Sequence, residues 1–254
     1  MSVTFGLFSD LHSSLPGASQ RGHSDRTLAD MRQGLKRFAD KGIDFAVNLG
    51  DSVQPAESVE AEYNQLASMK EEWDACPFPI YNAFGNHEFS QLSYDQIKTL
   101  FHTDCIYGAF EKNGIRFLIV DTCYRPDSVH YSEDNYDWRY AILPEEQVQW
   151  LKKQLAVKKR TVILTHVPLY FDPAKDEYGI FQIQNHEEVC QILTESGCVE
   201  AVFQGHVHTY GRSEYGGIPF INIPSPERSE EFAVTDFPIV TIDDTSITMD
   251  GKAL

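Results

Sequence analysis

The hydrophobic pattern of the first part of the chain alternates between two periods. Short apolar runs over residues 3–8, 45–49 and 80–83 predict buried strands. Between them, residues 27–41 space their apolar side chains along one helical face and end at a glycine, and a second helix is predicted from about residue 60. This β-α-β-α-β order predicts a first sheet that is largely parallel.

The rest of the chain continues with shorter elements. A helix is predicted at about residues 94–100, and the turn at residues 112–114 predicts a hairpin between strands 107–110 and 115–121. A helix starting at Pro144, a strand at 162–164 and a helix at 186–195 follow. We expect the last strands to complete a second, mainly antiparallel set, over residues 199–203, 219–223, 237–242 and 246–249.

Residues 124–142 interrupt this order with a polar, aromatic stretch that has no clear period. We interpret it as a surface excursion from a single domain that covers residues 1–254. Its aromatic residues either stack on a substrate or pack on the scaffold, and the pattern does not separate the two.

The charge of the chain narrows its partners. A formal net charge of −17 opposes a large nucleic-acid surface, because such surfaces depend on Lys and Arg. The five cysteines are widely spaced and include no C-x-x-C pair, so they predict reduced thiols. No basic leader or long apolar run is present, so we expect a cytoplasmic protein without membrane contact. No feature of the sequence sets an oligomeric state.

Five short segments place metal-ligand side chains directly after predicted strands. Loops at the carboxyl ends of neighbouring strands converge on one edge of an α/β sheet, so these side chains should meet. The candidate ligands are Asp10, His12, Asp51, Asn86, His166, His206 and His208. Carboxylate, amide and imidazole groups without a thiolate suit manganese, iron or zinc. In an acidic chain, such cations would also supply local positive charge.

The ordered motifs D-x-H, G-D, G-N-H-E, H-x-P and G-H-x-H resemble those of the calcineurin-like metallophosphoesterase superfamily. The resemblance covers residues 3–208 and implies a four-layer α/β sandwich of two mixed sheets flanked by helices. It also implies two divalent metal ions (Mn²⁺, Fe²⁺/Fe³⁺ or Zn²⁺) and a catalytic His87 that acts as general acid or stabilises the transition state. In its ligand scheme Asp51 bridges both ions, Asp10, His12 and His208 bind one, and Asn86, His166 and His206 bind the other.

A narrower similarity points to the manganese-dependent ADP-ribose/CDP-alcohol diphosphatase-like branch. It rests on segments 183–189, 198–206 and 217–220. The eukaryotic members of that branch have Gln where this chain has His12, so nucleoside-diphosphate specificity does not carry over directly. We expect a hydrolase in which a metal-bridging hydroxide attacks a nucleotide-like phosphodiester or diphosphate. The alternatives are a phosphomonoesterase and a non-catalytic scaffold on the same fold.

Substrate contacts are expected from three places. Tyr94 and Tyr170 follow the third and fourth motifs, and Trp138 and Tyr140 lie in the excursion. Arg21 and Arg26, after the first motif, could hold a distal phosphate, and the alternative is that they are surface charges. The remaining histidines are expected to be solvated, and Glu88 to be a support residue; these histidines are His23, His102, His130 and His186. Kinase, serine-hydrolase and dinucleotide fingerprints are absent from the sequence.

Overall fold

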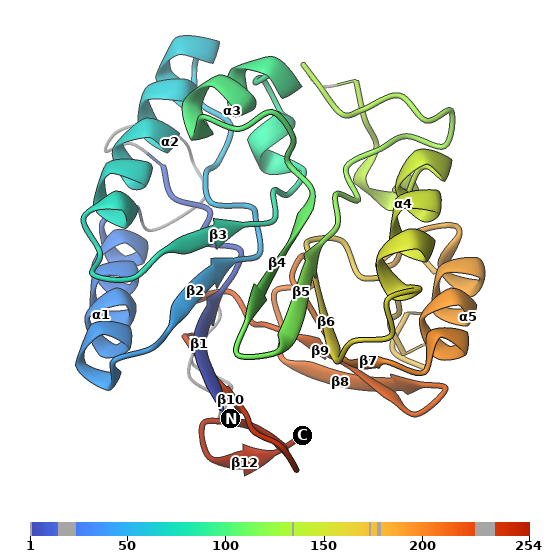
Figure 1. Cartoon of the computed structure of the whole chain (residues 1–254). Coiled ribbons are helices and arrows are strands. Elements are labelled where there is room, and N and C mark those ends of the chain that lie inside the picture. The colour runs from blue at the N-terminus through green and yellow to red at the C-terminus, as the bar shows by residue number, and fades with distance from the viewer. Residues whose placement is uncertain (1, 15–23, 134, 173, 177–178, 227–236) are drawn as a thin grey trace.

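The computed structural model describes residues 2–14, 24–133, 135–172, 174–176, 179–226 and 237–254, without the side chains of residues 24–26 (Figure 1). Two sheets of six strands each form its centre. The first sheet has the strand order β12-β11-β10-β1-β2-β3. Its strands are β1 (Val3–Phe8), β2 (Phe45–Asn48), β3 (Ile80–Asn82), β10 (Ile239–Ile242), β11 (Ile247–Met249) and β12 (Lys252–Ala253).

The second sheet has the strand order β4-β5-β6-β7-β9-β8. Its strands are β4 (Gly108–Lys112), β5 (Ile115–Ile119), β6 (Thr161–Thr165), β7 (Val199–Gln204), β8 (Gly211–Tyr215) and β9 (Ile218–Asn222). Strands β5, β6, β7 and β9 run parallel, and only the edge strands β4 and β8 are antiparallel. The expectation of a mainly antiparallel second set was therefore wrong. Strand β10 instead crosses back to pair with β1 in the first sheet.

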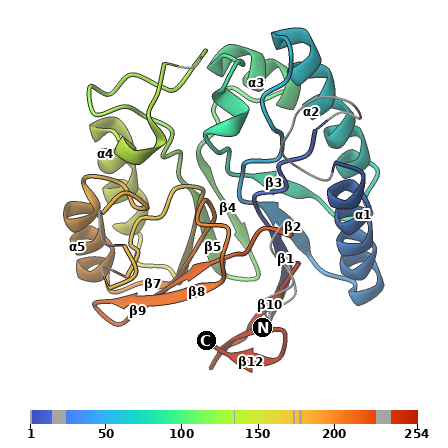
Figure 2. The same cartoon turned by 180° about the vertical axis from the view of Figure 1, so that it is seen from behind.

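Helices cover the outer face of each sheet (Figures 1 and 2). The first sheet is covered by α1 (Ser24–Lys41) and α2 (Val59–Asp74), and the second by α4 (Glu145–Leu155) and α5 (His186–Ser196). Helix α3 (Tyr94–Phe101) lies beside α2 at the top of the view in Figure 1. Two short 3₁₀ helices, η1 (His87–Phe89) and η2 (Trp138–Tyr140), lie in loops. The predicted four-layer sandwich of two mixed sheets and outer helices is confirmed.

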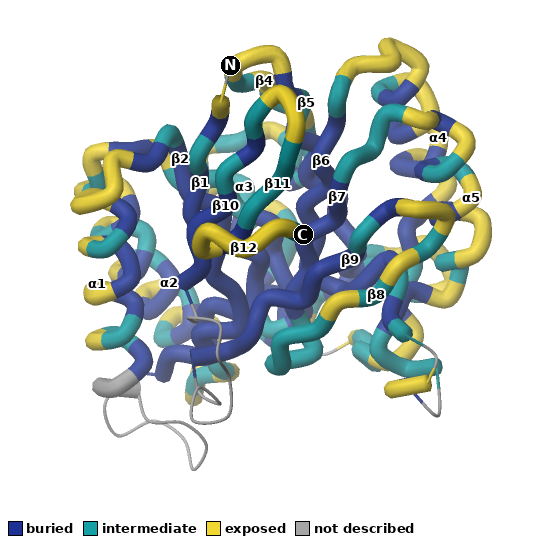
Figure 3. Tube along the Cα trace, turned by 90° about the horizontal axis from the view of Figure 1, so that it is seen from below, coloured by how far each residue is buried: buried dark blue, intermediate teal, exposed yellow. Residues whose placement is uncertain are grey.

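The apolar core follows the two-residue period of the strands. Along β1, Val3, Phe5 and Leu7 point between the two sheets, whereas Phe8 packs toward the helices. The ring of Phe5 stacks on Phe45 of the same sheet at 5.1 Å and contacts Phe203 of the other sheet at 5.9 Å. The most buried parts of the chain are the central strands of both sheets (Figure 3). This buried centre is the rigid base on which the loops after the strands stand.

Candidate metal centre

The loops after β1 and β2 stay paired beyond the ends of the strands. The Asp10 N–H donates to Gly50 O at 2.8 Å, and the His12 N–H donates to Asp51 O at 2.9 Å. The Gly205 N–H donates to His166 O at 3.0 Å and so joins the loops after β6 and β7. The loops that carry the candidate ligands are thus fixed by backbone hydrogen bonds, and the predicted convergence is observed.

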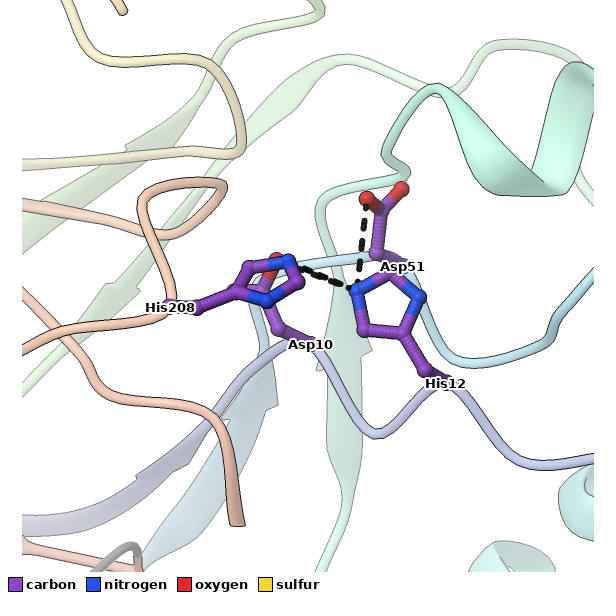
Figure 4. Close-up of side chains that lie close together, drawn as sticks. All are labelled: Asp10, His12, Asp51 and His208. Carbon is purple, nitrogen blue, oxygen red and sulfur yellow. Dashed lines mark hydrogen bonds and ion pairs between the residues drawn. The ribbon is translucent and has the colours of Figure 1, made fainter. Parts of the chain in front are cut away.

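One group of ligand atoms comprises those of Asp10, His12, Asp51 and His208, which all lie within 4.8 Å of one another (Figure 4). The Nε2 atoms of His12 and His208 are 2.8 Å apart. Asp10 Oδ1 lies 3.4 Å from His208 Nε2, and Asp51 Oδ2 lies 3.9 Å from His12 Nε2. Two carboxylates and two imidazoles therefore face one point, which is a donor set that fits a divalent cation.

A second group comprises Asp51, His166 and His206. His166 Nδ1 lies 2.8 Å from Leu49 O, which turns Nε2 toward Asp51 Oδ2, 3.3 Å away. The Nε2 atoms of His166 and His206 are buried and have no hydrogen-bond partner among the described residues. Buried polar atoms without a partner are costly, and a bound cation would satisfy both. Because Asp51 belongs to both groups, its carboxylate lies between two possible ion positions.

His87, the first residue of η1, approaches the same carboxylate, and Asn86 directly precedes it. The His87 N–H donates to Asp51 Oδ1 at 2.8 Å, and the His87 ring lies 4.5 Å from that of His12. The Oδ1 atom of Asn86 is buried without a partner in the described part of the chain, as a ligand oxygen awaiting a cation would be. His87 Nε2 is 3.9 Å from Asp51 Oδ2 and its side chain is 26% exposed, so substrate could reach it.

Most of the candidate ligands have unusual backbone conformations. Left-handed φ angles occur at Asp10 (53°), His12 (44°), Asp51 (53°), His206 (71°) and His208 (62°). Such angles are uncommon for residues other than glycine, and when clustered they are typical of functional sites. Gly205 has a different constraint, because a Cβ there would collide with the Ser9 hydroxyl. The local structure is thus shaped around the side chains that it presents.

The buried carboxylate of Glu88 links the loops after β2 and β3 by accepting hydrogen bonds from their backbone. Its carboxylate accepts the N–H groups of Asp51 at 2.9 Å, Ser52 at 2.5 Å and Gly85 at 2.8 Å. Burial and the charge of Asp51 raise the pKa of Glu88, whereas these N–H groups favour its charged form. Glu88 is therefore placed as the support residue that the sequence suggested.

Burial and neighbouring charges shift the pKa values of these side chains in different directions. Burial raises the pKa of Asp10, but the hydrogen bond with His12 and the charge of His208 outweigh it and lower this pKa to about 2. Burial lowers the pKa of His166, but Asp51 raises it to about 9. Burial lowers the pKa of His206 to about 3 and that of His87 to about 4. The His206 imidazole therefore presents a neutral lone pair, the form that binds a metal, whereas His166 is held in its charged form by Asp51.

The predicted substrate residues are scattered. Trp138 lies beside the second group, with its ring 5.3 Å from His206 and 6.0 Å from Phe181. Tyr140 is exposed, and Tyr170 packs against Tyr215 at 5.3 Å. Tyr94 contacts the ring of His130. Arg21 and the side chain of Arg26 lie outside the described part of the structure.

The expectation that His130 is solvated was wrong. Its side chain is only 13% exposed and its Nε2 lies 3.0 Å from Asp121 Oδ2. The polar composition of residues 124–142 favoured solvent exposure, but the segment folds back on itself, with Tyr124 bridged to both His130 and Ile142. Asp121 lies two residues after the end of β5, as Asp10 does after β1. This strand-end position is the sequence signal that indicates Asp121 as a partner for His130.

A family profile described as calcineurin-like phosphoesterase matches residues 3–210. The chain belongs to this family. The recognition made from the five motifs is confirmed, and with it the assignment to a family of metal-dependent phosphoester hydrolases with a dinuclear metal centre. Among the described residues, no helix is long and apolar enough to cross a membrane.

Individual relatives of this calcineurin-like chain are distant. It is 23% identical over 210 residues to a protein of Oryza sativa subsp. japonica named manganese-dependent ADP-ribose/CDP-alcohol diphosphatase, and the match spans 67% of this chain but only 64% of the relative. A dimetal phosphatase from Danio rerio has a similar structure, with a TM-score of 0.78, 18% identity, and coverage of 99% of this chain and 98% of that one. GAP50, the anchor in the inner membrane complex of Plasmodium, has a TM-score of 0.65 and 13% identity, with 98% and 83% coverage. The fold alone is therefore compatible with more than one role.

Proposed function

We propose that this protein is a dinuclear metal-dependent phosphohydrolase that acts on a nucleotide-like phosphodiester or diphosphate. The observation that carries this proposal is the position of Asp51, whose carboxylate belongs to both groups of ligand atoms. A carboxylate between two cations reduces their mutual repulsion, which terminal ligands do not. Family membership supports the same chemistry.

The residues fit two cations with distinct ligand sets around the shared Asp51. Asp10, His12 and His208 would hold one ion, and Asn86, His166 and His206 would hold the other. When bound, divalent cations lower the pKa of water and neutralise charge that develops on phosphate oxygens. The choice among manganese, iron and zinc is not fixed by these ligands, and the rice relative named as manganese-dependent supports manganese first.

His87 would serve the leaving group. It reaches the Asp51 carboxylate from η1, and it is not needed to complete either group of ligand atoms. Burial lowers its pKa in the free protein, but a bound phosphate would favour the protonated form, because opposite charges stabilise each other. His87 would then donate its proton to the leaving oxygen, the role of a general acid.

The organic part of the substrate would lie against Trp138. The Trp138 ring lies beside His206 and stacks with Phe181. The rings of Trp138 and Phe181 together form an aromatic surface next to the second group of ligand atoms. Nucleobases stack well on such surfaces. The name of the rice relative supports nucleoside-diphosphate compounds as the first class to test. A phosphomonoesterase acting on nucleotides could use the same surface, so relative rates on monoester and diester substrates must separate the two activities.

The test is a substrate panel combined with metal analysis. Purified protein loaded with Mn²⁺ should hydrolyse ADP-ribose, a CDP-alcohol and bis(p-nitrophenyl) phosphate faster than p-nitrophenyl phosphate. Faster turnover of the monoester would favour the phosphomonoesterase. A protein that retains no metal and hydrolyses none of these compounds with Mn²⁺, Zn²⁺ or Fe²⁺ would contradict the proposal and favour a scaffold.

A further inference from the structure

An ion pair joins residues 124–142 to the end of β5, away from the proposed ligands. His130 Nε2 lies 3.0 Å from Asp121 Oδ2, and His130 Nδ1 lies 2.6 Å from the backbone oxygen of Tyr131. The other Asp121 oxygen accepts the Cys123 N–H at 3.0 Å. Asp121 is buried and is fixed by its own loop, so it holds the histidine ring in one place.

The two contacts of His130 indicate its protonation state. A backbone carbonyl and an ionised carboxylate only accept hydrogen bonds. A neutral imidazole has one N–H and could satisfy only one of them, whereas an imidazolium satisfies both. The geometry of this buried ring is therefore that of a cation.

Three aromatic rings surround the His130 ring. Their centroids lie 4.4 Å (Phe89), 4.8 Å (Tyr94) and 4.7 Å (Tyr124) from that of His130, with interplanar angles of 76–80°. They come from η1, from α3 and from the strand-like pairing within the segment, and they enclose the His130 side chain, which is 13% exposed. Burial raises the pKa of both tyrosines, so Asp121 is the anionic group among these neighbours.

Contacts within residues 124–142 connect His130 to Trp138, which lies beside the proposed metal centre. The side-chain amide of Asn135 donates to His130 O at 3.3 Å. Tyr131, which directly follows His130 in the chain, is fully buried, and its ring stacks on that of Tyr136 at 4.6 Å. Trp138, two residues after Tyr136, begins η2, and its ring lies beside that of His206. The place of Trp138 therefore depends on how the chain is held at His130.

We propose that His130 is a positioning residue, whose charged ring holds residues 124–142 on Asp121 so that Trp138 can receive the organic part of the substrate. This inference rests on the proposed function. It predicts that selection for nucleotide-like substrates weakens as pH rises, because deprotonation of His130 removes one of its two hydrogen bonds. Burial lowers the pKa of His130, but Asp121 outweighs it and raises this pKa above the usual value of about 6.5. The loss should therefore occur above that pH.

The kinetic test compares two substrates, so that effects on the metals cancel. The ratio of kcat/KM for ADP-ribose to that for bis(p-nitrophenyl) phosphate should fall about 5- to 150-fold in His130→Gln, through KM for ADP-ribose. Adding Trp138→Ala to His130→Gln should cause no further fall, because both changes remove the same contact. The exposed control His102→Asn should leave the ratio unchanged. An unchanged ratio in His130→Gln, or additive losses in the double variant, would overturn the proposal.

A second readout needs no turnover. In ¹⁵N NMR of metal-free protein, both ring nitrogens of His130 should be protonated at pH 6, and the Trp138 fluorescence, isolated by difference from Trp138→Phe, should change with the same midpoint when His130 titrates. Asp121→Asn should lower that midpoint, which also tests the idea if His130→Gln does not fold. A neutral His130 at pH 6, or Trp138 emission that ignores its titration, would contradict the inference. Failure of the wild type to hydrolyse either substrate would refute the proposed function and leave these two readouts intact.

Discussion

Replacement of Glu88 by Gln should weaken both the fold and the metal centre. The Glu88 carboxylate accepts three backbone N–H groups from the two loops around Asp51. A glutamine keeps one acceptor oxygen, which can still serve Asp51 and Gly85, but it turns an NH₂ group toward the N–H of Ser52. A hydrogen bond to a charged group contributes about 1.5–3 kcal/mol, and an unsatisfied buried donor costs about 1–3 kcal/mol. We therefore expect the free energy of unfolding to fall by about 2.5–6 kcal/mol, the sum of these two contributions.

Urea denaturation of the metal-free protein measures this loss, and titration with Mn²⁺ measures the effect on the centre. Because the loop that is released carries Asp51, metal affinity should fall as well, by at least tenfold, the range seen for outer-shell partners of metal ligands. The matched control is Glu60→Gln, which changes an exposed glutamate of the same type. If Glu88→Gln unfolds at the same urea concentration as the wild type and binds Mn²⁺ equally well, Glu88 does not support the site.

Three further outcomes follow from particular side chains. His87→Ala should keep its metals, and its kcat should fall about 10²- to 10⁴-fold for alkyl esters but less for nitrophenyl esters. Equal losses of kcat for the two kinds of ester, measured in a stopped assay, would exclude a general-acid role for His87. Trp138→Ala with Tyr140→Ala should raise KM for ADP-ribose about 5- to 150-fold and spare a small aryl phosphate, and steady-state kinetics in which both substrates respond alike would assign these rings to packing. Burial raises the pKa of Glu62 to about 7, so the protein should lose stability as pH rises from about 4.5 to 7. The stability of Glu62→Gln relative to wild type, measured by denaturation, should be about 2–3 kcal/mol more favourable at pH 8 than at pH 5, and a parallel pH dependence of the two proteins would rule this out.

The positions of the candidate ligands could be predicted because the rule behind them is local. Each strand that ends in the core is followed at once by its loop, so the sequence shows Asp10 after β1 and Asp51 after β2. Neighbouring parallel strands then bring those loops to one edge of a sheet. His166 and His206 follow β6 and β7 of the other sheet, so their approach to Asp51 depends on how the two sheets pack and not on the strand-end rule alone.

Other features could not be predicted, because they depend on contacts between distant parts of the chain. Strand β10 could pair with either sheet by its hydrophobic pattern, and it crosses back to β1. The left-handed φ angles at Asp10 and Asp51 leave no mark in the sequence, since Asp occurs in many conformations. His130 was assigned to solvent because its neighbours in sequence are polar, while the partners that bury it come from η1, α3 and the end of β5.

The shared position of Asp51 is the central claim, and metal stoichiometry in Asp51→Asn tests it most directly. The wild type should bind two Mn²⁺ ions per chain, by elemental analysis after gel filtration at ordinary metal concentrations. An asparagine retains an oxygen but not the negative charge that offsets repulsion between two cations. Asp51→Asn should therefore retain at most one ion and lose nearly all hydrolysis of bis(p-nitrophenyl) phosphate. Two ions per chain in that variant would contradict the bridging role and the dinuclear centre built on it.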